Sequence, residues 1–436
     1  MSDSISTANT PPGCVLVLGG GGFIGATVCA ALRQAGWRVR RLVRPGRALG
    51  ADEVAGDLAT LTQVGDWLPL LDGVDAVVNS AGILRETRHD RFGPIHHDAP
   101  MALAQACAQR GIRRFVQISA LGRPEDGEFV ASKHRFDAAL QACLPGALVL
   151  RPSVVYASSG SYGGTSLLRS LAAFPGVLPL PGQAQWLIQP AAAEDLARLV
   201  VIGLQRELAG SFEVGGPAPL SLRDYQLQWR QWLRIAGSRC WPLPAAWISL
   251  AVALGDRLGN GPMTSVIWRM LRRGNVTAPD AHDAVQRAFG FAPRDLGEVL
   301  GATPSAVQDR WHAQLHLLVV PLKLAVVALW LLSALAGWLT PAPQIEAMAA
   351  GSWLAQLAPV ELARATAGLD LLLALWLALA RHPRPAIVLM ILSVLAYTLA
   401  FGLALPAQWL DPLGGLAKNL VILPALAVLW VLAERR

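Results

Sequence analysis

Gly19, Gly22 and Gly25 stand three residues apart. They directly follow the short apolar run Cys14 to Leu18, which predicts a strand buried on both faces. A turn that approaches a pyrophosphate closely must exclude side chains, and the helix beginning near Phe23 would offer it free N–H groups. The pattern therefore predicts a dinucleotide site. The residues of the turn that we expect to contact the cofactor are Gly19, Gly22, Phe23, Ile24 and Gly25.

Three arginines stand at the end of the next predicted strand, which runs from Trp37 to Val43: Arg40, Arg41 and Arg44. Sites that prefer NAD usually carry an acidic residue here, which binds the 2′-hydroxyl of the adenosine ribose. A guanidinium instead binds the 2′-phosphate of NADP by donating two parallel hydrogen bonds. We therefore predict NADP(H) in preference to NAD(H), with Arg44 as the contact. The alternative is that these arginines only face water.

Short apolar runs alternate with helical stretches through the first 150 residues. This alternation predicts a parallel sheet with helices on both faces, that is, an α/β Rossmann domain with a doubly wound parallel sheet. The expected strands are 14–18, 37–43, 76–78, 114–119 and 147–151, and the expected helices are 26–35, 96–110 and 129–143.

The pattern is looser from 153 to 300, where loops rich in Gly and Pro alternate with helices near 191–206 and 221–236. The stretch 244–273 is amphipathic, with tryptophans among arginines. We interpret residues 221–310 as a helical cap, or substrate region, and linker. A helix lying on lipid is the alternative for 244–273.

Composition separates the chain into a soluble part and an apolar part. Of 436 residues, 53% are apolar and only 15% are charged, and the deficit of charge falls in the last hundred or so. The net charge of +7 comes from scattered arginines, so we predict no nucleic-acid partner. Five well-separated cysteines without a CxxC motif suit a reducing compartment. Residues 1–12 are polar, and we expect them to be disordered and not a signal peptide.

Four apolar segments near the end of the chain are long enough to cross a bilayer, which needs about 20 residues. They are Leu317 to Leu339, Val360 to Ala380, Ala386 to Leu405 and Leu416 to Ala433. The loop 381–384 and the tail 434–436 are basic, whereas 341–358 and 406–415 contain no Lys or Arg. Because basic loops stay in the cytoplasm, we predict an integral inner-membrane protein of bacterial type. It would have four spans, with the soluble domain and the C-terminus cytoplasmic.

Ionisable residues within these spans are costly in lipid and usually pair or line a cavity. Glu361 and Arg364 lie on neighbouring positions of one helical face and could pair, or lie where water reaches them. Asp370 is deeper, and Lys323 or Lys418 on another helix is its natural partner. No metal site is predicted, because the adjacent histidines at 96 and 97 would face different directions.

Four further motifs follow the glycine turn: Gly56-Asp57-Leu58, Asn79-Ser80-Ala81-Gly82, Ile118-Ser119-Ala120 and Arg151-Pro152-Ser153-Val154-Val155-Tyr156. With these motifs, residues 13–220 resemble the short-chain dehydrogenase/reductase superfamily. The resemblance is to its extended or atypical branch, which includes the complex I accessory subunit and NAD-dependent epimerase/dehydratase-like proteins. It implies that Asp57-Leu58 lies along the adenine and that Ser80-Ala81-Gly82 lines the cofactor. The segment after Arg151 would approach the nicotinamide. Further contacts implied are Pro152, Ser153, Val154 and Val155.

In active members of that superfamily a Ser, a Tyr and a Lys four residues after the Tyr perform the chemistry. The Tyr acts as general acid and base, and the Lys lowers its pKa and holds the ribose. Ser119 and Lys133 match this pattern, but Phe129 stands where the Tyr is expected and has no proton to give. Two interpretations stay open. Either another group, such as Ser119, Tyr156 or water, supplies the proton, or the nucleotide is bound without turnover.

Residues 317–433 are similar to the DoxX-like four-helix membrane family. Arg364, Gly368 and Asp370 match its pattern on the second span, and Lys418-Asn419 opens the fourth. The residues singled out in this all-α four-helix bundle are Glu361, Arg364, Asp370 and Lys418. The family name implies a membrane quinone as a partner. The alternatives are a lipid-like substrate, a role as an accessory subunit of a membrane complex, or a simple anchor.

Overall fold

The computed structural model describes residues 13–46, 48–161, 163–258, 264–380, 382–410 and 415–433. Residues 1–12, the basic tail 434–436 and Arg381 of the predicted cytoplasmic loop lie outside the described residues. The chain divides into two compact units, Met1–Arg310 and Trp311–Arg436.

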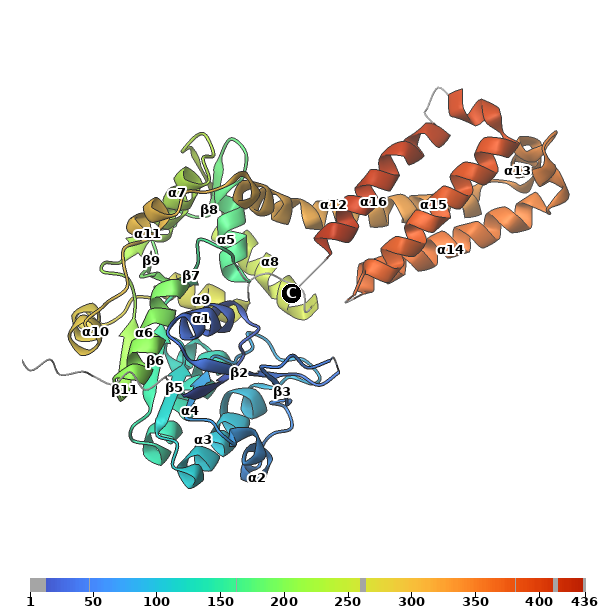
Figure 1. The fold of residues 1–436 in the computed structure, drawn as a ribbon. Coiled ribbons are helices and arrows are strands. Elements are labelled where there is room, and N and C mark those ends of the chain that lie inside the picture. Colours follow the sequence, from blue (N-terminus) through green and yellow to red (C-terminus); the bar gives the residue numbers. More distant parts are fainter. Residues whose placement is uncertain are drawn as a thin grey trace, which may run out of the picture. The chain divides into compact units, whose positions relative to one another are not determined.

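A seven-stranded parallel sheet forms the centre of the first unit, in the order β11-β6-β5-β4-β1-β2-β3 (Figure 1). The strand order reverses between β1 and β4, and ligands of such sheets bind at that point, outside the carboxyl ends of the strands. The strands are β1 Cys14–Leu18, β2 Arg38–Val43, β3 Glu53–Ala55, β4 Ala76–Asn79, β5 Arg114–Ile118, β6 Leu148–Pro152 and β11 Gly210–Val214.

Both faces of this sheet are covered, which explains why β1 is continuously apolar. Val15 and Val17 pack into one core together with α1 (Phe23–Gln34) and α6 (Ala193–Gln205). Leu16 and Leu18 point the other way, into a core with α3 (Ala99–Arg110) and α4 (Glu128–Cys143). The Rossmann fold expected from the alternating strands and helices is confirmed.

Shorter elements complete the first unit. The amphipathic stretch 244–273 forms two helices, α8 (Ala245–Leu258) and α9 (Ser265–Arg273). The remaining helices are α2 Val64–Trp67, α5 Gly164–Ala172, α7 Leu222–Trp232, α10 Ala281–Phe289 and α11 Leu296–Ala302. Three two-stranded sheets pair β7 Val155–Tyr156 with β10 Ala191–Ala192, β9 Leu187–Ile188 with β12 Leu220–Ser221, and β8 Leu178–Pro181 with β13 Cys240–Leu243.

Apolar helices make up the second unit. Three of those described are long and apolar enough to cross a membrane: α12 (Val307–Leu339), α14 (Pro359–Leu379) and α15 (Arg384–Ala404). The fourth predicted span is shorter, with a 3-10 turn followed by α16 (Asn419–Leu432). Side chains from all four helices form one core. The short helix α13 (Ala342–Ala349) follows α12.

The polar side chains of the second unit have partners that differ from those expected. Arg364 donates to the carbonyl oxygens of Gly337 and Thr340 near the end of α12, and not to Glu361. Asp370 accepts a hydrogen bond of 2.6 Å from the Ser333 hydroxyl, so the contact shown for this carboxylate is a neutral side chain and not a lysine. Sequence spacing located these residues on their helices but not the carbonyls and hydroxyl that face them.

Candidate dinucleotide site

The turn between β1 and α1 is tightly closed. The Gly22 N–H donates to the Gly19 carbonyl at 2.9 Å, and Gly19 adopts a φ of +70°. A Cβ on Gly25 would lie 2.1 Å from the Gly19 oxygen and 2.6 Å from the Ser80 hydroxyl oxygen. That hydroxyl in turn donates to the Leu18 carbonyl at 2.6 Å. Gly25 therefore lets the first turn of α1 pack directly on the strand ends, as phosphate-binding turns require.

A cavity of about 210 Å³ opens at this turn. It continues past the end of β2 and the loop after β3 to the loop after β4, so it occupies the reversal point of the sheet. Its lining contains seven of the sixteen predicted cofactor residues and four further residues. The lining residues are Gly19, Gly22, Leu42, Arg44, Gly56, Leu58, Ser80, Ala81, Gly82, Ile83 and Ile95.

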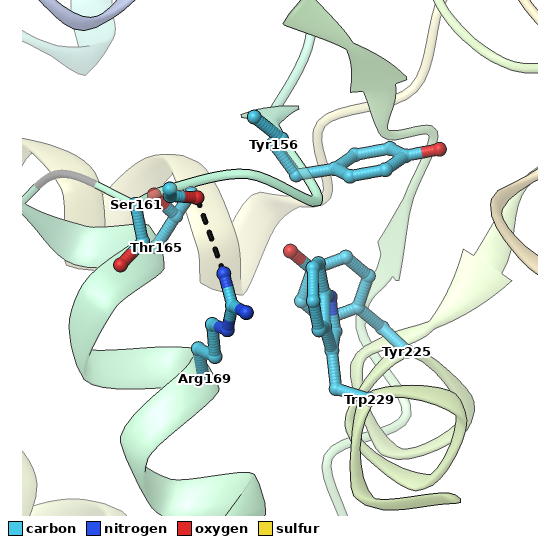
Figure 2. Close-up of a pocket in the computed structure, with 8 residues that line it drawn as sticks. Tyr156, Ser161, Thr165, Arg169, Tyr225 and Trp229 are labelled. Carbon is cyan, nitrogen blue, oxygen red and sulfur yellow. Dashed lines mark hydrogen bonds between the residues drawn. The ribbon is translucent and has the colours of Figure 1, made fainter. Parts of the chain in front are cut away.

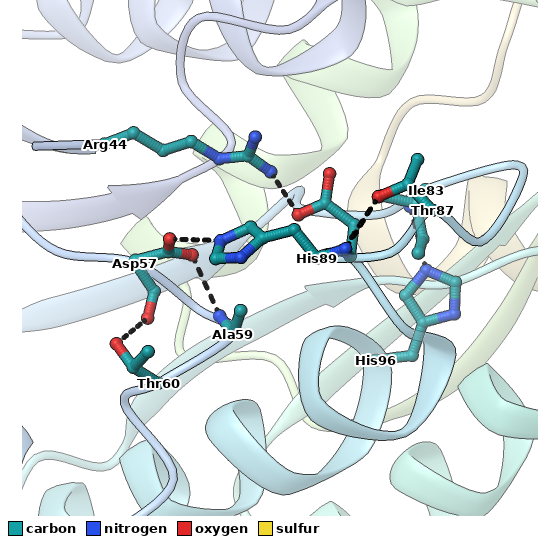
Figure 3. A network of polar contacts seen from close by, with 9 residues as sticks. Arg44, Asp57, Ala59, Thr60, Ile83, Thr87, His89 and His96 are labelled. Carbon is teal, nitrogen blue, oxygen red and sulfur yellow. Dashed lines mark hydrogen bonds and ion pairs between the residues drawn. The ribbon is translucent and has the colours of Figure 1, made fainter.

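A segment after β4, residues 83–92, is bonded to Arg44 and Asp57 beside this cavity (Figure 3). The Arg44 guanidinium donates to the Asp90 carboxylate at 2.8 Å, and His89 Nε2 lies 2.7 Å from the Asp57 carboxylate. Burial alone would raise the pKa of Asp57, but the Ala59 N–H and His89 outweigh it and lower that pKa. Arg44 thus already has an anionic partner, which a 2′-phosphate would have to displace.

Lys133 lies behind Gly82, one of the residues that line the cavity. A Cβ on Gly82 would meet the Lys133 ammonium nitrogen at 3.3 Å. The ammonium donates to the carbonyls of Ile118 at 3.0 Å and Ala81 at 3.4 Å, and the residue is only 6% exposed. Burial lowers the pKa of Lys133 to about 8, against a smaller raising effect of Asp137. The lysine therefore carries a proton that it can release near neutral pH.

His96 is fixed beside Lys133 as a neutral group. Its Nε2 accepts a hydrogen bond of 2.9 Å from the Ile83 N–H, and its Nδ1 lies 2.8 Å from the Ser132 hydroxyl oxygen. Burial, and then the Lys133 charge, lower the pKa of His96 to about 2. An imidazole that accepts at Nε2 carries its proton on Nδ1, so His96 holds the backbone of residue 83 at the cavity wall.

Ser119 is bound to a buried carboxylate. Its hydroxyl donates to Asp137 at 2.8 Å, and the Arg151 guanidinium donates to the same carboxylate oxygen at 2.9 Å. Asp137 is fully buried on α4, one turn after Lys133. The spacing of four residues from Lys133 was the signal that could have identified it. This network ties the ends of β5 and β6 to α4.

Phe129 is half-buried at the start of α4, with its ring centroid 5.8 Å from that of His96 and nearly perpendicular to it. It is therefore on the same helix as Lys133, one turn earlier.

The predicted cofactor residues after β6 make other contacts. The Ser153 hydroxyl donates to the Asn275 carbonyl at 2.7 Å and so binds a loop of the same unit. Val154 and Val155 stay partly exposed beside it.

A small second cavity lies between α5 and α7 (Figure 2). Arg169, which is 3% exposed, stacks on Trp229 and Trp232 and forms an ion pair of 2.9 Å with Asp309. Burial raises the pKa of Tyr156, which also lines this cavity, well above its usual range. Tyr156, which sequence reasoning offered as a substitute acid, therefore lies in a buried aromatic cluster that suits a structural role.

Comparison with known proteins defines the class of each part. Residues 15–135 match the NAD dependent epimerase/dehydratase family, so the Rossmann domain of the first unit is similar to the domains of that family. Residues 327–430 match the DoxX-like family. The chain is thus similar to the epimerase/dehydratase family in its first unit and to the DoxX-like family in its second, as the motifs had indicated.

Individual relatives are similar over part of the chain. Ceramide reductase of Caulobacter vibrioides is 32% identical over 206 residues, which cover 44% of this chain and 63% of the relative. Among solved structures, gox2253 has a TM-score of 0.51 at 20% identity and covers 69% of this chain and 99% of its own. The Bordetella bronchiseptica enzyme WbmG, solved with NAD, has a TM-score of 0.50 at 14% identity, covering 70% and 97%. These two structures support the fold.

Proposed function

We propose that this protein is a membrane-anchored NAD(P)H-dependent reductase that acts on a ketone of a long-chain, ceramide-like lipid. The observation that carries the proposal is the cavity that joins the glycine turn to the end of β4, with Lys133 behind it. The name of the similar ceramide reductase suggests the substrate class. Helices that can cross a membrane in the same chain would keep the domain where such a lipid resides.

The bound cofactor would supply a hydride. The residues of the chain would bind the cofactor and supply the proton. The free amides at the start of α1 bind the pyrophosphate, and Gly25 keeps them close to the strand ends. The alcohol forms when the ketone carbon takes the hydride and its oxygen takes a proton. With Phe129 in the expected tyrosine position, we assign that proton to the Lys133 ammonium, which regains one from water afterwards.

The full chain reconstituted in nanodiscs tests this assignment. We expect NADPH oxidation that depends on added keto-ceramide or another long-chain keto-amide, with formation of the corresponding alcohol. Oxidation without any lipid alcohol, or no oxidation despite nucleotide binding, would contradict it. Adding a quinone to the same assay tests quinone coupling, which predicts faster oxidation with quinone alone.

We also propose NADP(H) as the preferred cofactor, because Arg44 lines the adenosine end of the cavity. Arg44→Gln should weaken NADPH binding about tenfold, which corresponds to about 1.4 kcal/mol, and leave NADH binding nearly unchanged. Asp90→Asn is the matched control: it frees the guanidinium from its present partner, so NADPH should bind more tightly. Titration of both cofactors measures this. Equal effects of Arg44→Gln on NADPH and NADH would contradict the assignment.

A non-catalytic, nucleotide-binding accessory subunit is the second candidate. Phe129 and the bonding of the Ser119 hydroxyl to Asp137 favour it, because both remove the usual acid machinery. Under this candidate a Phe129→Tyr variant, which restores a phenol one turn before Lys133, should gain reductase turnover from a wild-type baseline of zero. Under the reductase proposal the wild type already turns over, and the variant changes its rate and pH profile.

The proposed placement in the membrane is four spans with the first unit and the C-terminus in the cytoplasm of a bacterial-type inner membrane. The basic segments 381–384 and 434–436 support it through the positive-inside rule. Labelling of single introduced cysteines with a membrane-impermeant reagent in intact cells tests it. The loop 341–358 should react from outside, and residue 207 should not.

A further inference from the structure

Large apolar side chains are exposed on two consecutive elements of the first unit, β13 and α8. Trp241 is 54% exposed, Trp247 is 70% exposed and Leu250 is 61% exposed. We call these three residues the tryptophan surface. Trp247, Leu250 and Ala251 follow one another at helical spacing, so α8 presents a continuous apolar face.

The opposite face of α8 holds the helix to the first unit. Ser249 accepts a hydrogen bond of 3.0 Å from the Trp268 indole, and Val252 is 7% exposed. The Asp256 carboxylate accepts hydrogen bonds from the Arg85 guanidinium at 3.2 Å and from the Ser265 N–H at 3.0 Å. Because these contacts fix the rotation of the helix, Trp247 and Leu250 stay on its outer side while α8 is packed in place.

Charge is arranged to suit an anionic partner. Between positions 238 and 258 the only ionisable side chains of Arg, Lys, Asp or Glu are Arg239, Asp256 and Arg257. Both arginines are exposed, whereas Asp256 is bonded to Arg85 and Ser265. In the sequence, the tryptophan surface therefore lies between two exposed arginines. Tryptophans with flanking arginines are typical of side chains that lie at the headgroup level of a bilayer.

We propose that the tryptophan surface lies in the interfacial layer of an anionic lipid bilayer. The same chain contains helices that can cross a membrane, so a bilayer is always within its reach. The indole rings would enter the boundary between headgroups and acyl chains, and Arg239 and Arg257 would bind lipid phosphates. Arg85 belongs to the segment that is bonded to Arg44 beside the dinucleotide cavity, so the docked helix is bonded to that segment.

A nitroxide placed on Leu250→Cys in the full chain tests this proposal. The background carries Cys143→Ser and Cys240→Ser, because the other three cysteines are buried. The protein is reconstituted in nanodiscs containing phosphatidylglycerol, and collisions with oxygen and with a water-soluble nickel chelate are measured. The matched control is a label on Gln205→Cys, an exposed position on α6.

We expect the ratio of oxygen to nickel collisions at position 250 to exceed that at 205 by at least about fivefold, since oxygen concentrates in lipid. The ratio should fall by half or more when all the lipid is phosphatidylcholine. A ratio equal to that of the control would show exposure to water and overturn the proposal. Suppression of both collision rates would show that protein covers the surface, either the second unit or another copy, and would also overturn it.

Discussion

Replacing Gly25 with alanine should abolish tight nucleotide binding, with a loss of at least about 100-fold for both NADPH and NADH. The new methyl group would lie 2.1 Å from the Gly19 carbonyl oxygen, far inside contact distance. Both that oxygen and the Ser80 hydroxyl belong to the floor of the turn, so α1 must move away and its free amides leave the pyrophosphate. A 100-fold loss corresponds to about 2.7 kcal/mol. Fluorescence titration in detergent measures it.

Gly21→Ala is the matched control in the same turn, because a Cβ there meets nothing within 4 Å. We expect its affinity to stay within about threefold of the wild type. The thermal midpoint of each variant separates loss of binding from loss of folding. If Gly25→Ala bound both nucleotides normally, the glycine turn would not be the phosphate site, and the functional proposal would fail with it.

Replacing Lys133 with methionine should lower turnover by at least about 100-fold, the usual contribution of a positioned proton donor. In the wild type, turnover at saturating substrate should fall as the pH rises through about 8, because the amine that forms there has no proton to give. Lys133→Arg is the informative second variant. It keeps the charge and should keep nucleotide affinity within about tenfold, but a guanidinium does not release a proton, so turnover should remain lost.

The lowered pKa of Lys133 also makes the stability of the fold depend on pH, in a direction that can be stated. Its pKa lies below the unfolded value of 10.5, so between about pH 8 and 10.5 the unfolded chain binds a proton that the folded chain does not. The stability contribution of Lys133 therefore rises with pH across that window and is absent from the methionine variant. The thermal midpoint of the wild type minus that of Lys133→Met should therefore rise with pH across this window. A constant difference would mean that the ammonium is not desolvated.

The sequence predicted the central strands because they are buried on both faces and therefore apolar throughout, as in Cys14–Leu18. It missed β11, whose residues are mostly half-exposed and so lack that signal. It also missed β8 and β13, which contain prolines that usually argue against a strand. Their pairing depends on long-range contacts that local composition does not encode.

The sequence predicted those parts of the candidate site where the backbone conformation requires particular residues. The glycine turn and the Ser80-Ala81-Gly82 stretch were found because close approach leaves few alternatives, and the structure brings them into one cavity. Pairings across long sequence distances were not predictable. Asp90 lies 46 residues from Arg44, and Asp137 lies 18 residues from Ser119. Only the folded chain pairs those carboxylates with Arg44 and Ser119.

The two contacts from His89 and Asp90 also have a kinetic consequence. In the proposed binding mode the nucleotide enters and leaves past these bonds to Asp57 and Arg44, so we expect them to slow both association and release. Because the Arg44 side chain is 61% exposed, its bond to Asp90 is weakened by dissolved salt. Exchange of bound nucleotide should therefore become faster as ionic strength rises, which stopped-flow mixing would reveal.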